Sequence, residues 1–181
     1  MWDSKSFLQQ NPEFFINVNV SAKQLERPDF CRVVLELLDK TEFPVKHLCL
    51  EITERCRSLP VSVINERMAV LRGYGIKFAM DDFGTGSSSS AMALEMLIDE
   101  IKIDMSFIRK ILVNKKNKAI VQSMVDFANA ANIKSCLEGV ENEALEDYLR
   151  TVGATWFQGY YYSKPVGADE LEILLSNSWK K

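Results

Sequence analysis

The sequence predicts an α/β fold of the TIM type, a β/α-barrel that is incomplete and has about six of the eight strand–helix units. Short β-rich runs alternate strictly with helical segments, and no linker or low-complexity segment interrupts them. This alternation is typical of a parallel sheet covered by helices. In addition, every β-rich run ends in polar side chains, which favours a barrel over an open sheet.

The expected strands are six short apolar runs. They cover residues 14–20, 48–52, 76–81, 100–104, 134–138 and 155–159. Helices are expected after them: one capped by Asp29 with apolar residues at 33, 34, 37 and 38, and others at 63–71, 91–97, 119–131, 143–152 and 168–176.

Polar residues stand at or next to the carboxyl end of each expected strand. They are Asn19, Glu51, Asp81 with Asp82, Lys102 with Asp104, Glu138 and Gln158. In a β/α-barrel these ends converge on one face, where active sites are built. A doubly wound open sheet would gather its ligand at a switch point and would not need a contribution from every strand.

The segment 80–90 is the most informative of these strand ends. An apolar run from Ile76 to Met80 ends in two adjacent carboxylates, followed by a Gly-Thr-Gly-Ser loop. Two like charges at the tip of a buried strand are costly unless cations bind there, and a glycine-rich loop presents backbone donors. The pattern indicates a divalent-metal site facing a phosphate. The alternative is a surface turn with a solvated pair of aspartates.

Composition excludes several classes of protein. The chain has 181 residues, 47% hydrophobic and 26% charged, as in a globular domain, and its net charge of −3 argues against a DNA duplex as partner. It has no apolar run of the roughly 20 residues that a membrane helix needs and no signal-peptide pattern, so a cytoplasmic protein is expected. The single histidine, His47, argues against zinc hydrolases and Ser-His-Asp triads.

Structural roles remain open for the same polar residues. Asn19 and Gln158 are also consistent with side-chain amides that make structural hydrogen bonds at strand ends. Lys102 is consistent with an ion pair to Asp104. Glu51 and Glu54 suit an ion-paired and a solvated carboxylate, while Glu138 and Glu141 suit the start of the following helix.

Six ordered motifs resemble those of the EAL-domain family, the cyclic di-GMP phosphodiesterases. They are Asn19-Val20-Ser21, Glu51-Ile52-Thr53-Glu54, Asp81-Asp82-Phe83-Gly84-Thr85-Gly86, Lys102-Ile103-Asp104, Glu138-Gly139-Val140-Glu141 and Gln158-Gly159-Tyr160. The resemblance implies a β/α-barrel that uses two Mg²⁺ or Mn²⁺ ions to hydrolyse cyclic di-GMP to linear pGpG. Oxygen-rich ligands suit such hard cations.

The resemblance also implies a role for each residue. Metal ligands would be Asn19, Glu51, Asp81 and Asp82; catalytic residues would be Lys102, Glu138 and Gln158; Glu54 would stabilise the loop at Gly84; and substrate would contact Asp104, Gly84, Thr85 and Gly86. Its implied partners are cyclic di-GMP, a second copy in a homodimer, and an upstream sensor or diguanylate cyclase domain.

The chain is expected to be a single EAL-type domain that is truncated at its N-terminus. Residues 1–12 read as a helix tail or linker and residues 13–181 as strand–helix units, so the first two strands and the Glu-Ala-Leu motif would be missing. Ser87 and Ser90 also depart from the tyrosine and leucine common in the family.

The sequence is therefore consistent with three functions. The first is the phosphodiesterase. The second is a catalytically inactive EAL-like module that binds cyclic di-GMP or a protein partner. A third, to which the loop conforms less well, is a metal-dependent barrel that abstracts a proton with a lysine.

Overall fold

Six parallel strands form one sheet in which neighbours in the chain are neighbours in space. The structure is a computed structural model that describes residues 7–8, 11–53, 59–86 and 89–177. The strands are β1 (Ile16–Val20), β2 (Leu48–Thr53), β3 (Lys77–Phe83), β4 (Glu100–Ile103), β5 (Lys134–Glu138) and β6 (Trp156–Gln158), paired in that order. Parallel pairing in chain order requires a crossover after every strand, as in a β/α-barrel.

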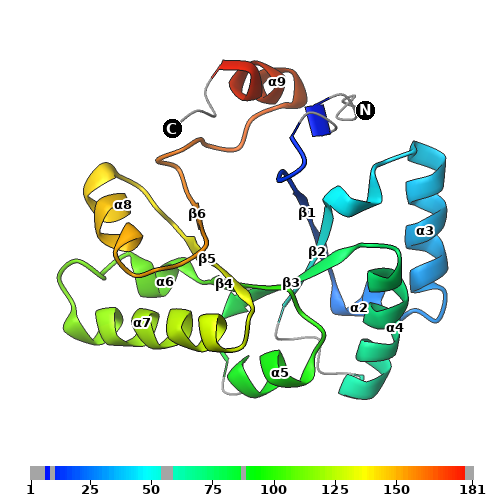
Figure 1. Cartoon of the computed structure of the whole chain (residues 1–181), viewed down its shortest axis with the longest axis horizontal. Coiled ribbons are helices and arrows are strands. Elements are labelled where there is room, and N and C mark those ends of the chain that lie inside the picture. The colour runs from blue at the N-terminus through cyan, green and yellow to red at the C-terminus, as the bar shows by residue number, and fades with distance from the viewer. Residues whose placement is uncertain (1–6, 9–10, 54–58, 87–88, 178–181) are drawn as a thin grey trace.

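Helices connect the strands and lie around the outside of the sheet (Figure 1). The longer ones are α3 (Phe30–Thr41), α4 (Val61–Gly73), α5 (Ser89–Glu95), α7 (Lys115–Ala130), α8 (Glu143–Arg150) and α9 (Ala168–Asn177). Three short elements were not expected from the sequence: α2 (Ala22–Glu26), the 3-10 turn η1 (Val45–His47) and α6 (Met105–Ile108). The helices in the described part of the chain are all too short or too polar to span a lipid bilayer.

The sheet curls into a half-barrel, which confirms the predicted fold class. Its two outer strands approach each other at their amino ends, where the rings of Phe15 and Trp156 have centroids 6.5 Å apart. Lys77 places its ammonium 3.7 Å from the centre of the Phe15 ring, inside this curl. The inner face of the sheet is therefore concave and lined by side chains from several strands.

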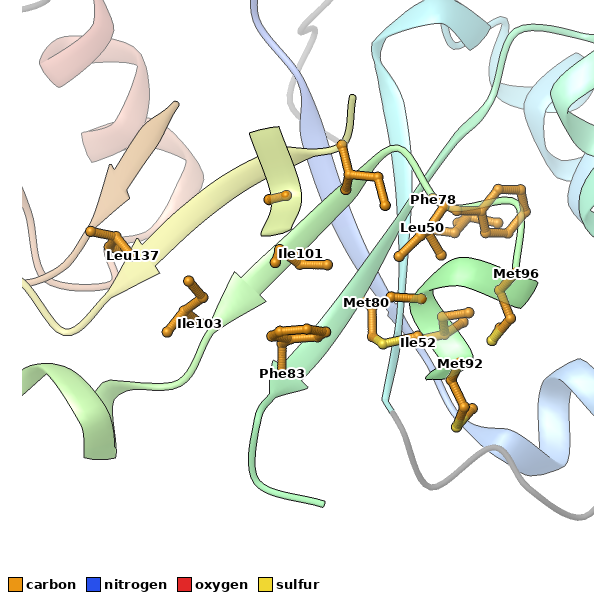
Figure 2. Packing of buried hydrophobic residues seen from close by; sticks show 14 of the residues in the cluster. Leu50, Ile52, Phe78, Met80, Phe83, Met92, Met96, Ile101, Ile103 and Leu137 are labelled. Atoms are coloured by element: carbon orange, nitrogen blue, oxygen red, sulfur yellow. The ribbon is translucent and has the colours of Figure 1, made fainter. Parts of the chain in front are cut away.

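The main hydrophobic core lies between the outer face of the sheet and the helices. Alternate residues of the strands point outward. Figure 2 shows those of β2 to β5 packed near Met92 of α5 and near Met96, which directly follows that helix. Those of the central strands are almost completely buried: Leu50, Ile52, Phe78, Met80, Ile101, Ile103 and Leu137. Because side chains alternate along a strand, the intervening residues face the inside of the curl.

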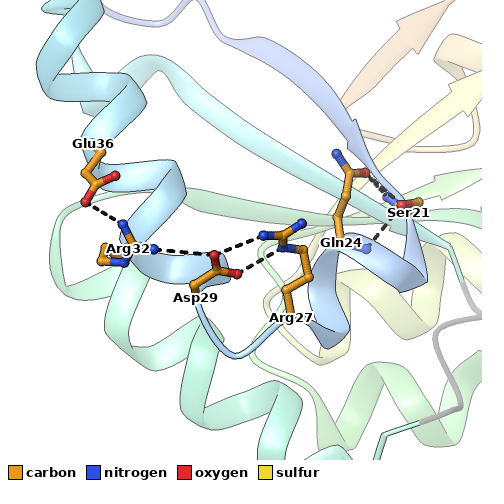
Figure 3. Close-up of polar contacts among 6 residues, drawn as sticks. All are labelled: Ser21, Gln24, Arg27, Asp29, Arg32 and Glu36. Carbon is orange, nitrogen blue, oxygen red and sulfur yellow. Dashed lines mark hydrogen bonds and ion pairs between the residues drawn. The ribbon is translucent and has the colours of Figure 1, made fainter.

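Ser21 and Asp29 begin the first two helices in different ways (Figure 3). Ser21 forms a capping box with Gln24, in which each side chain contacts the other's backbone N–H. Asp29 was expected to cap α3, but its side chain makes no capping hydrogen bond. Its carboxylate binds Arg27 and Arg32 at 2.9 and 3.4 Å instead.

Candidate active site

Lys102 joins carboxylates from three other strands on the concave face. Its ammonium lies 2.7 Å from Glu51 Oε1, 2.9 Å from Glu138 Oε1 and 3.6 Å from Asp81 Oδ1. The Lys102 and Glu51 side chains are each 5% exposed, so water screens their interaction poorly. One cation thus holds together acids from β2, β3 and β5. This cluster, defined as Glu51, Asp81, Lys102 and Glu138, is the candidate site.

The electrostatics of the cluster keep Lys102 charged. Burial by itself lowers the pKa of Lys102, but hydrogen bonds to Glu51 and Glu138 outweigh it and raise that pKa above its usual value. The pKa of Glu138 is also raised, because burial outweighs its hydrogen bond to Lys102 and Asp81 lies nearby. Lys102 is therefore a fixed cation at neutral pH rather than a proton acceptor.

An irregularity in β3 sets the directions of the two adjacent aspartates. The pairing of β3 with β4 shifts register between Met80 and Phe83, so Asp81 and Asp82 lie at a bulge. Asp82 has φ of 56°, in the left-handed region, where aspartate is tolerated better than most residues. Bulges and such backbone conformations often lie next to active sites, where they redirect side chains.

The glycine-rich loop begins immediately after the bulge. The Asp82 carbonyl accepts hydrogen bonds from the backbone N–H of Thr85 at 3.1 Å and from its hydroxyl at 2.9 Å. Thr85 and Gly86 are exposed, and Gly84 is half-buried. The loop therefore folds back on the bulge that positions the aspartates and leaves residues 85 and 86 open to solvent.

Replacing Gly84 by alanine is expected to destabilise the protein by about 1–3 kcal/mol. Gly84 has φ of 95°, and an added Cβ would lie 3.1 Å from the Phe107 ring and closer still to Met124. Chemical denaturation of Gly84→Ala beside Gly73→Ala measures the difference. Nothing lies within 4 Å of a Cβ at Gly73, so comparable losses in both variants would contradict a steric requirement at Gly84.

Asn19 and Gln158 lie beside the cluster on neighbouring strands. Asn19 is paired in register with Glu51, and Gln158 with Glu138. Both are exposed, and among the described residues neither side chain makes a hydrogen bond. Asn17, two residues earlier in β1, instead donates from Nδ2 to Glu51 Oε1 at 2.8 Å. The period of two in β1 could have identified Asn17, because it places residues 17 and 19 on the same face.

The remaining predicted residues have mixed outcomes. Asp104 does not pair with Lys102; its carboxylate caps α6 by accepting from Ser106 N at 2.9 Å. Glu54 lies outside the described residues. The start of α8 is capped by Asn142, whose side chain accepts from Leu145 N at 3.0 Å, and not by Glu138 or Glu141.

A Glu-Ala-Leu tripeptide occurs in the chain, at residues 143–145. It forms the first turn of α8, where Glu143 is exposed and Leu145 is buried. This glutamate lies on a helix and not at a strand end, so it supplies no carboxylate to the cluster.

The donor atoms of the cluster suit hard divalent cations. As they stand, no three His, Cys, Asp or Glu side chains in the described part of the chain are arranged to hold a metal ion. The Glu51, Asp81 and Glu138 carboxylates nevertheless all lie within 3.6 Å of one ammonium, so they already converge on a cation. Carboxylate oxygens are the ligands that Mg²⁺ and Mn²⁺ prefer. The residues present therefore fit such a metal.

Comparison with known proteins identifies relatives of this chain in sequence and in structure. The cyclic di-GMP phosphodiesterase PdeA of Borreliella burgdorferi is 33% identical over 161 residues, which are 89% of this chain and 24% of that protein. The EAL enzyme Bd1971, in a structure with cAMP and cyclic di-GMP bound, superposes with a TM-score of 0.87 at 32% identity, covering 94% of this chain and 46% of that one.

A third protein has been solved with metal. Klebsiella pneumoniae BlrP1, in a manganese and cyclic di-GMP complex, gives a TM-score of 0.77 at 27% identity over 91% of this chain and 44% of that one. The chain thus spans about a quarter of the curated relative and under half of these two solved chains. The EAL domain family model matches residues 2–165, and the chain belongs to the EAL domain family.

Proposed function

We propose that this chain supplies most of the active site of a cyclic di-GMP phosphodiesterase, which hydrolyses one phosphodiester bond to give linear pGpG. The observation that supports the proposal is the convergence of Glu51, Asp81 and Glu138 on Lys102 at one face of the half-barrel. Relatives named as phosphodiesterases of cyclic di-GMP share the family. Clustered acids suit the divalent cations that offset the negative charge of a phosphodiester during its hydrolysis.

Each residue receives a role in this proposal. Asn19, Glu51 and Asp81 would hold one Mg²⁺ or Mn²⁺ ion. Asp81 and Asp82 would hold a second ion. When bound, the two ions would supply Lewis acidity and lower the pKa of a bound water. Asn17 orients Glu51 through its hydrogen bond. Gln158, adjacent to Glu138 in register, would fix a water near that carboxylate.

Lys102 acts in this account as a permanent positive charge. Its raised pKa prevents it from taking a proton from water. It holds Glu51 and Glu138 in place and offsets negative charge that develops on the phosphate. Glu138 has a raised pKa, which brings it closer to the range in which a carboxylate accepts a proton. Asp104, Gly84, Thr85 and Gly86 would contact the substrate, and Glu54 would support the loop.

Chromatography of cyclic di-GMP incubated with the chain and Mn²⁺, with and without a chelator, tests the function. Formation of pGpG only with free Mn²⁺ is the expected result. Calorimetric binding of cyclic di-GMP without any pGpG would instead favour the second candidate, an inactive module that binds the nucleotide. Its support is the altered loop, in which Ser87 and Ser90 stand where the family commonly has tyrosine and leucine.

The variant Asp82→Asn is expected to lower the rate of pGpG formation by about 100-fold or more, because a ligand charge is lost. Stability should change little, since asparagine also tolerates the left-handed backbone at φ of 56°. Asp82→Val is the matched contrast: it should lose activity and also unfold more easily. Full activity of Asp82→Asn would remove Asp82 from the site.

The same proposal covers the domain content, the cellular location and the oligomeric state of the protein. We infer one EAL-type domain over residues 1–181, which acts in the cytoplasm and forms part of a longer protein with a sensor or diguanylate cyclase domain. A homodimer is the assembly that the family resemblance implies. Size-exclusion chromatography with light scattering tests the dimer.

A further inference from the structure

The connection from α6 to α7 concentrates positive charge. Residues 109–118 contain five cations and no acid, whereas the whole chain has a net charge of −3. Helix starts favour acidic residues, because their backbone N–H groups carry positive partial charge. α7 nevertheless begins with Lys115 and Lys116 and has no acidic residue in its first turn. Lysines in the first turn of a helix, where acidic residues are favoured, therefore indicate a function other than stabilising the fold.

Two aliphatic side chains project from the middle of this segment. Leu112 is 43% exposed and Val113 is 88% exposed, while the preceding Ile111 is completely buried. The turn is held by hydrogen bonds from the Val113 and Asn114 N–H groups to the Lys110 carbonyl, at 3.2 and 2.9 Å. Buried Ile111 and these bonds fix the tip, so the structure holds Leu112 and Val113 outward.

The cations of the segment differ in what they contact. Arg109 Nε lies 4.0 Å from Glu141, and the Lys118 ammonium lies 4.5 Å from the centre of the Tyr148 ring. Lys110, Lys115 and Lys116 are exposed, and within the described ranges none of the three forms an ion pair. Three charges that form no ion pair among the described residues therefore flank two exposed aliphatic side chains in the sequence.

We propose that residues 109–118 dock on an anionic phospholipid bilayer. Lysines beside an anionic membrane each gain about 1 kcal/mol, and exposed aliphatic side chains add binding by entering the headgroup boundary. The segment has no aromatic side chain on which nucleic-acid bases could stack. Its unpaired cations are lysines, whose flexible point charges suit a diffuse anionic surface better than a defined acidic site on a protein.

Co-sedimentation of the full chain with vesicles tests this proposal. Binding is expected to phosphatidylcholine vesicles that contain about 30% phosphatidylglycerol, but not to pure phosphatidylcholine, and it should weaken strongly above about 0.5 M salt. Lys115→Ala with Lys116→Ala should weaken binding roughly tenfold or more, and Val113→Ser should weaken it several-fold. Lys23→Ala with Lys40→Ala removes the same charge from exposed positions elsewhere and should bind like the original chain.

Several outcomes would overturn the proposal. They are no vesicle binding, equal binding to neutral vesicles, and equal losses in the two double variants. Retention on immobilised polyglutamate without vesicle binding would also overturn it, in favour of an acidic macromolecule. Alanine has a higher helix propensity than lysine, so the double variant should keep α7 intact, and circular dichroism verifies this. Co-sedimentation measures vesicle binding and not hydrolysis of cyclic di-GMP, so its result does not depend on the proposed phosphodiesterase activity.

Discussion

Lys102→Met should destabilise the protein by about 3–5 kcal/mol and reduce pGpG formation to background, because it leaves buried acids without their cation. Glu51 and Glu138 lie 2.7 and 2.9 Å from the Lys102 ammonium. Without it, the Glu138 carboxylate would take up a proton more readily, because Lys102 lowers the pKa of Glu138. The loss of stability should therefore be smaller near pH 5 than near pH 8. Urea denaturation of the variant at both pH values measures it.

Lys134→Met is the matched control for this prediction. Lys134 begins β5 but is exposed, and among the described residues it forms no ion pair. Its replacement should change stability by no more than about 0.5 kcal/mol. If Lys102→Met were no less stable than Lys134→Met, the ion pairs of the cluster would contribute nothing to the fold. Restoration of part of the lost stability by Mn²⁺ would show that the same carboxylates bind metal.

Glu100→Gln should stabilise the protein at alkaline pH and leave it unchanged in acid. Burial raises the pKa of Glu100 from 4.5 to about 7, against the attraction of Lys102 and with the repulsion of Glu51 and Glu138. Between these values the folded state binds more protons than the unfolded state, so stability falls as pH rises. Ionisation of Glu100 destabilises the original chain by about 3 kcal/mol above pH ~7, and this destabilisation is absent below pH ~4.5.

Thermal unfolding of Glu100→Gln and of the original chain between pH ~4 and ~8.5 gives this difference as a function of pH. Glu95→Gln serves as control, since Glu95 is exposed on α5. Its free energy of unfolding should stay within about 0.5 kcal/mol of that of the original chain, because Glu95 is a surface residue. A pH-independent difference for Glu100→Gln would show that Glu100 is ionised normally in the folded protein.

The arrangement of the sheet could be predicted because it depends on pattern alone. Alternation of strands and helices requires parallel pairing, and parallel pairing brings Glu51, Lys102 and Glu138 to the same rim. Within each strand, the alternation of side chains between the two faces also separates the buried outward residues from the polar inward ones. These regularities needed no knowledge of individual contacts.

The individual side-chain partners could not be predicted in the same way. Asn17 and Asn19 lie on the same face of β1, and only the packing of the strand decides that Asn17 bonds to Glu51. Asp104 was a candidate partner of Lys102, but it caps the one-turn helix α6, which has no apolar periodicity to reveal it. The helix predicted at 119–131 begins four residues after the start of α7, because residues 115–118 carry no apolar periodicity.

The number of Mn²⁺ ions bound per chain in the presence of cyclic di-GMP tests the proposed cluster most directly. Titration calorimetry with and without the nucleotide gives that number. We expect two ions for the original chain and one for Asp82→Asn, with pGpG appearing only when both sites are filled. Hydrolysis without bound Mn²⁺ or Mg²⁺, or an unchanged count in a variant that lacks both Glu51 and Asp81 carboxylates, would contradict it.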